Sequence, residues 1–297
     1  MKDNIIERRN YEYSQLIEDF KSEIKTLNIQ GVTGPHFPGV GDSYTNAKYK
    51  FAFCGIETYG WYSMSSFLDT KPENYLTEID NCLNNLGFLK WMDNYHATFG
   101  GFVLKFLSQF YKIEMSKLIV PNDNTDILGV LKSFVWSNAY SIERHEVFNI
   151  GQGSNKKAWE QIKKASMKFD DLNHIINSCN PKVIFILTGG TDANNIVNDA
   201  TISKIYNIDT NNKGNILKIA HTGEVEYDYF YLRNTDTHLF KLPHPKWMGL
   251  YSGIGMDKYV EFLICDLSNY KIWDNLPSSI QDTFDRNGKK INTRSAK

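Results

Sequence analysis

The stretch Pro181-Lys-Val-Ile-Phe-Ile-Leu-Thr-Gly-Gly190 carries the clearest structural signal in the chain. Residues 182–187 form a continuous apolar run, which begins after a proline and is followed by a Thr-Gly-Gly turn. A run of this length, rich in β-branched and aromatic residues, is typical of a strand that is buried on both faces of a sheet. We therefore expect residues 182–187 to be the central strand of the fold.

The segments on either side of this strand alternate between helical and extended patterns. Short apolar runs predict further strands at 49–54, 131–136 and 239–242. Apolar residues at helical spacing predict helices at 11–27, 74–91, 99–111, 158–179 and 256–267. The polar segment 201–233, which alternates at 225–231, predicts an inserted antiparallel hairpin. Together these elements predict an α/β protein, a three-layer αβα sandwich around a mainly parallel central sheet.

The composition is that of an ordinary globular protein. The chain has 297 residues, of which 41% are hydrophobic and 23% charged, and these values exclude disordered, collagen-like and coiled-coil architectures. No linker or internal repeat divides it, so we expect one domain at 31–284, after a helical extension at 1–30 and before a basic tail at 285–297. The net charge is −1, so any contact with nucleic acid must come from local basic groups.

The sequence gives no sign of a cofactor, a disulfide framework or a membrane anchor. Its 4 cysteines include no CxxC pair and its 7 histidines no HExxH motif, so we expect no zinc site, iron–sulfur cluster or other cofactor. The charged N-terminus lacks the apolar stretch of a signal peptide, and no apolar run is long enough for a membrane span. We expect a cytoplasmic monomer.

Polar groups follow each of the four predicted strands. Glu57 follows the first strand, Asn138 the second, the Thr188-Gly189-Gly190 turn the third and His244 the last. In an open α/β sheet, ligands bind beyond the carboxyl ends of the strands. The sequence therefore predicts that these groups form one site, in which the Thr-Gly-Gly turn offers backbone N–H groups to an anion at a helix N-terminus.

These motifs resemble those of the uracil-DNA glycosylase superfamily. Gly55-Ile-Glu-Thr-Tyr59 is similar to the family's first motif, which takes forms such as GQDPY, GEAPG or GMNPG. Asn138 ends its strand as the family's base-reading asparagine does, and Pro181–Gly189 matches a later strand of the type PRLIVALG. His244-Pro-Lys246 is similar to the last motif, HPS. The resemblance spans residues 31 to 250, with threonine in place of proline in the first motif and lysine in place of serine in the last.

The resemblance implies a monofunctional DNA glycosylase that acts in DNA repair or antiphage defence. It would flip a nucleotide out of DNA and hydrolyse the N-glycosidic bond of uracil or a modified pyrimidine, including a hypermodified phage base. Its catalytic residues would be Glu57 and His244. Base recognition would fall to Asn138, Tyr59 and Phe67, of which Phe67 would stack on the base unless it belongs to the core. DNA would be held by Lys241, Lys246, Thr188, Gly189, Gly190 and an apolar wedge, Trp247 and Met248.

Two other functions remain open at the level of sequence. A non-catalytic reader of modified or damaged DNA could use the same pocket, but it would have no need of the Glu57 carboxylate, which repels phosphate. A nucleotide hydrolase or phosphotransferase could use the Thr-Gly-Gly turn, but the chain lacks the GxxxxGK[ST] loop and an acidic metal cluster. The identity of the excised base is not determined by the sequence.

Overall fold

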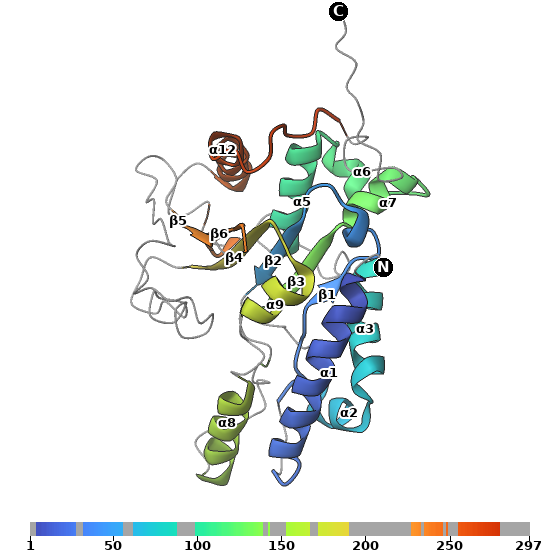
Figure 1. The fold of residues 1–297 in the computed structure, drawn as a ribbon, viewed down its shortest axis with the longest axis vertical. Helices are drawn as coiled ribbons and strands as arrows, with labels where there is room; N and C mark the ends of the chain where they lie inside the picture. The colour runs from blue at the N-terminus through green and yellow to red at the C-terminus, as the bar shows by residue number, and fades with distance from the viewer. Residues whose placement is uncertain are drawn as a thin grey trace, which may run out of the picture.

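A computed structural model describes residues 4–27, 32–55, 62–87, 99–138, 142, 153–166, 172–189, 227–232, 235–245, 248 and 255–279. Within them the chain forms an α/β fold, with a six-stranded sheet and helices on both of its faces (Figure 1). The strands are β1 (Gly39–Val40), β2 (Phe51–Gly55), β3 (Phe134–Asn138), β4 (Val183–Gly189), β5 (Asp228–Leu232) and β6 (Thr237–Pro243). The predicted central strand is thus confirmed as β4, which pairs with β2 on one side and β6 on the other.

The sheet is mixed, which corrects the prediction of a mainly parallel sheet. The strand order is β1-β3-β2-β4-β6-β5. The four inner strands β3, β2, β4 and β6 are parallel, whereas β1 and β5 pair antiparallel with their neighbours at the two edges. Only residues 233–236 connect β5 to β6, and so short a connection excludes the crossover that parallel pairing requires.

β5, within the alternating segment 225–231, pairs antiparallel with β6, so a hairpin joins the end of the predicted insertion to the last predicted strand. Residues 201–226 lie outside the described residues.

The two faces of the sheet carry side chains of different sizes, because successive strand residues point to opposite faces. One face is aromatic and is covered by α5 (Phe99–Tyr111) and α12 (Gly255–Asn269), with α6 (Met115–Ile119) and α7 (Thr125–Leu131) beside them. At its centre the Phe185 ring lies 5.5 Å from that of Phe53 and 4.8 Å from that of Phe106. The opposite face presents smaller residues, such as Ala52 and Cys54, to α9 (Leu172–Cys179).

The N-terminal helix α1 (Ile5–Ile24) packs on this second side of the molecule (Figure 1). The Asn4 side chain caps it by accepting from the N–H of Ile6 at 3.1 Å. Its buried residues recur at helical spacing and face α3 (Pro72–Asn84), α8 (Gly153–Ser166) and α9. Two short elements complete the described fold, the 3₁₀ turn η1 (Tyr44–Asn46) and α2 (Met64–Asp69). The predicted helix 99–111 is confirmed as α5.

The predicted helix 158–179 is wrong, because two helices, α8 and α9, occupy this part of the sequence. Ile162 and Ala165 of α8 pack in the same apolar cluster as α1, whereas Leu172 and Ile176 of α9 pack on the sheet. A single straight helix cannot bury one continuous apolar face against both partners. No helix in the described part of the chain combines the length and apolar composition needed to cross a membrane.

Candidate functional site at the carboxyl ends of the parallel strands

The four parallel strands place their carboxyl ends at one edge of the sheet. Gly55 ends β2 in register with Asn138, which ends β3, and Gly189 of β4 pairs with Pro243, which ends β6 and precedes His244. Asn138 and His244 therefore lie at the same edge, on strands that are three inter-strand spacings apart, or roughly 14 Å.

Asn138 is buried, and part of its hydrogen-bonding capacity is unused. It is 7% exposed and shares the α5-facing side of β3 with Phe134 and Trp136. Its amide nitrogen Nδ2 has no hydrogen-bond partner among the described residues. Because an unsatisfied buried donor costs on the order of 1–3 kcal/mol, a ligand that accepts a hydrogen bond from Nδ2 would remove this cost.

Gly55 makes room for the Asn138 side chain. A methyl group added at Gly55 would lie 2.7 Å from Oδ1 of Asn138 and 3.3 Å from the ring of Phe99. Both distances are shorter than an ordinary van der Waals contact, so any larger residue at this position would displace one of the two side chains. The glycine at the end of β2 is thus required by its neighbours.

Two aromatic residues that the sequence reasoning missed surround this position. Phe99, the half-buried first residue of α5, stacks on Trp136 with ring centroids 6.4 Å apart and an interplanar angle of 27°. His36 also contacts the Trp136 ring, with centroids 4.6 Å apart. The position of Phe99 in a predicted helix gave no sign of its contact with Gly55. His36 stands between glycines and prolines, where no pattern indicates its partners.

Burial lowers the pKa of His36 to about 3, so this imidazole is neutral at physiological pH. Since that pKa lies below the ordinary value of 6.5, the unfolded chain binds a proton at higher pH than the folded chain does. The folded state therefore loses stability as the pH falls from about 6.5 toward 3.

We expect the His36→Phe variant to show a weaker dependence of stability on pH. Between about pH 7.5 and pH 5, the linkage of one such histidine amounts to roughly 2 kcal/mol. Urea unfolding of both proteins at the two pH values measures this difference. Burial also lowers the pKa of His238, to about 4. His238 is present in both proteins, so its contribution to the pH dependence cancels in the comparison. Equal pH dependence of the two proteins would contradict the neutral assignment of His36.

Phe67 lies in an apolar cluster, which is the core alternative that the sequence left open for this residue. It is fully buried in α2, where its ring packs against Phe20, Phe37 and Tyr75. The ammonium group of Lys21 lies 5.0 Å from the ring centroid on another side. Spacing from the first motif suggested a base-stacking role, but the apolar face of α2 is covered by α1. Within the described part of the chain, the Phe99 ring lies close to Gly55.

Two of the residues expected to contact DNA are buried, contrary to the prediction. Met248 is 1% exposed and packs in the aromatic-face cluster with residues of α12, so it is not an exposed wedge. Lys241 is 8% exposed, because β6 is an inner strand, and it offers little surface to a phosphate. Thr188 and Gly189 belong to β4, whose register shifts between Ile186 and Gly189. The other predicted site residues, Glu57, Tyr59, Gly190, Lys246 and Trp247, lie outside the described residues.

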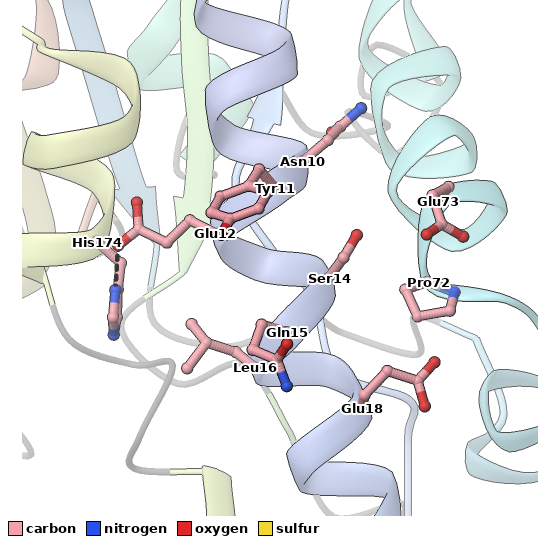
Figure 2. A pocket seen from close by; sticks show the side chains of 10 residues that line it. All are labelled: Asn10, Tyr11, Glu12, Ser14, Gln15, Leu16, Glu18, Pro72, Glu73 and His174. Carbon is pink, nitrogen blue, oxygen red and sulfur yellow. Dashed lines mark hydrogen bonds and ion pairs between the residues drawn. The ribbon is translucent and has the colours of Figure 1, made fainter.

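A separate groove of about 630 Å³ runs along the outer side of α1, between α3 and α9 (Figure 2). Its side chains spread outward from the helices, and Tyr11 is 84% exposed. Nδ1 of His174 and Oε1 of Glu12 are hydrogen-bonded beside it, 2.5 Å apart. Because α1 and α9 cover the face of the sheet opposite to α5, this groove is separate from the strand-end site.

No group of three or more histidine, cysteine, aspartate or glutamate side chains in the described ranges is arranged to hold a metal ion. Comparison with protein-family models, with curated proteins and with solved structures found no match for this chain. The inference of a function therefore rests on the residues at the strand ends.

Proposed function

We propose that the chain is a monofunctional DNA glycosylase that removes uracil or a modified pyrimidine from DNA in repair or antiphage defence. The observation that carries this proposal is the shared edge of the sheet, where the buried Asn138 ends β3 and His244 directly follows the parallel strand β6. The motif resemblance supplies the reaction, because it assigns base recognition and catalysis to these two residues.

Asn138 suits base recognition. Its amide offers a donor and an acceptor side by side, the pair that an edge of a pyrimidine can match. With Nδ2 unused among the described residues and Oδ1 close to Gly55, the side chain has a donor to give to a base carbonyl. Phe99 lies beside the same glycine and contributes an apolar wall.

His244 suits stabilisation of the leaving group. Cleavage of an N-glycosidic bond builds negative charge on the departing base, and a hydrogen bond to the pyrimidine O2 would strengthen as that charge develops. A preorganised donor of this kind contributes on the order of 3 kcal/mol to the transition state. His244 is half-buried between Pro243 and Pro245, and these prolines restrict the backbone that carries the imidazole.

Glu57 completes the proposed chemistry. It follows Gly55 by two residues, and in the proposal its carboxylate stabilises the positive charge on the sugar and orients the attacking water. Tyr59 would border the base, and Lys246 and Trp247, which follow His244 in the chain, would contact the DNA backbone and duplex. DNA is then the partner, and no cofactor enters the reaction.

The proposal is tested with oligonucleotides that each carry one modified pyrimidine, in single and double strands. We expect release of one free base, detected by chromatography, and a strand that breaks at that site only after alkali. Asn138→Ala should abolish or redirect this release while the far-ultraviolet circular dichroism is unchanged. Tight binding of a modified strand without release of any base would instead identify a non-catalytic reader.

A monofunctional enzyme should form no covalent adduct with DNA. A bifunctional glycosylase attacks the sugar with an uncharged amine, which requires a desolvated lysine. Lys246 is the lysine of the last motif, in a polar segment next to Pro245 that should keep it hydrated and charged. We therefore expect borohydride to trap no complex. An adduct that disappears in Lys246→Ala would show that this lysine is the nucleophile.

A further inference from the structure

The segment 34–40 runs along the outer edge of the sheet, where side chains of two helices hydrogen-bond to its backbone. Arg9 of α1 is fully buried and donates from Nη1 to the carbonyl oxygen of Pro38 at 2.9 Å. Asp80 of α3 accepts from the N–H of Val40 at 2.8 Å. Arg9 and Asp80 also form an ion pair with each other. These two charged residues thus hold both ends of β1.

The other side of the same segment lies against β3 near Asn138. Gly39 pairs with Trp136 and Val40 with Val135 in antiparallel register. The pairing begins with Gly39 opposite Trp136, which stands two residues before Asn138 on β3. The contact between His36 and Trp136 lies in the same stretch. The segment therefore lies against Trp136, on the side of β3 that faces away from β2.

A buried ion pair carries a desolvation cost, so its presence here points to a role in fixing the position of segment 34–40. Removing two charges from water offsets most of their mutual attraction, so an apolar pair in the same space would serve stability as well or better. The arginine guanidinium group (the fork), in contrast, fixes the directions of its hydrogen bonds, because its donors are rigidly arranged in one plane. Here the fork spans Pro38 and Asp80 and so determines where the backbone between them lies.

We propose that Arg9 and Asp80 are positioning residues for base recognition. They fix segment 34–40 against β3 and, through Trp136 and its neighbours, hold the Asn138 amide in the orientation that receives the base. This role rests on the proposed function, since it assigns the recognition step to Asn138.

The test compares Arg9→Lys and Asp80→Asn with Ile17→Ala. Arg9→Lys keeps the charge without the fork, and Asp80→Asn keeps an acceptor for Val40 without the ion pair. Ile17 is fully buried on the same face of α1, so its truncation loosens the core without removing a bond to segment 34–40. All proteins are measured at a temperature at which circular dichroism shows them folded.

The first measurement is the ratio of single-turnover excision rates for the preferred base and a second base of the panel. A small misplacement of a reacting or recognition group can cost up to about 100-fold, so we expect this ratio to fall roughly tenfold in both charge variants. Ile17→Ala should leave the ratio unchanged. A ratio that is the same in all four proteins would overturn the positioning role.

The second measurement does not depend on catalysis. The side-chain amide signals of Asn138 in nuclear magnetic resonance spectra, assigned with Asn138→Ala, should shift in Arg9→Lys and Asp80→Asn but not in Ile17→Ala. If the unmodified chain excises no base, the proposed function fails, and these signals alone decide whether the pair positions Asn138. Unshifted signals in both charge variants would refute the inference.

Discussion

Replacing His244 with alanine will lower the single-turnover excision rate roughly 10²–10³-fold, the effect of removing one donor that acts on developing negative charge. DNA affinity should change far less, because the hydrogen bond gains its strength only as the base departs. The ground-state complex with DNA therefore loses little binding free energy. Excision is followed with a labelled oligonucleotide under enzyme excess, and binding is measured separately by fluorescence anisotropy.

His174 provides the matched control for this substitution. It is a histidine of α9 that is hydrogen-bonded to Glu12, on the opposite side of the sheet from the α5 face. His174→Ala should excise the base at a rate close to that of the unmodified chain. If His244→Ala also excised the base at an unchanged rate, His244 would have no part in the mechanism.

Gly55→Ala will reduce excision by on the order of 100-fold, because misplacement of a recognition group by about 1 Å has effects of this size. The added methyl would lie 2.7 Å from Oδ1 of Asn138 and 3.3 Å from the Phe99 ring. Relief of that overlap requires movement of the Asn138 side chain or the Phe99 ring. We expect a stability loss of about 1–3 kcal/mol, which is typical of overpacking.

Two further variants separate the local clash from a general loss of stability. In Gly55→Ala/Asn138→Ala the clashing oxygen is absent, so the double variant should be more stable than the sum of the two single changes predicts. Gly255→Ala introduces strain at a φ of +73° with no atom within 4 Å of the new methyl. It should lose stability but retain excision. Additive stability effects at residues 55 and 138 would argue against their contact.

The sequence was most informative where a local pattern is sufficient by itself to determine the structure. The apolar run of β4 and the spacing of α5 were sufficient to predict both elements. The strand-end rule also brought Asn138 and His244 to one edge, because parallel strands end together. Spacing does not reveal which layer covers a residue. Met248, which the sequence places in an exposed wedge, and Phe67, which it places beside the base or in the core, both lie in apolar clusters. Phe99 was missed because its contact with Gly55 joins distant parts of the chain.

The bond between Asp80 and the N–H of Val40 has a consequence for the behaviour of the chain in concentrated solution. The exposed edge of a sheet offers unpaired backbone donors on which a strand of another molecule can add, a common route to aggregation. Here β1 is two residues long and one of its donors is already occupied by a carboxylate. An incoming strand would have to displace a charged group that is itself paired with a buried arginine. This edge is thus protected against intermolecular strand addition by the residues of α1 and α3 that bury it and occupy its backbone groups.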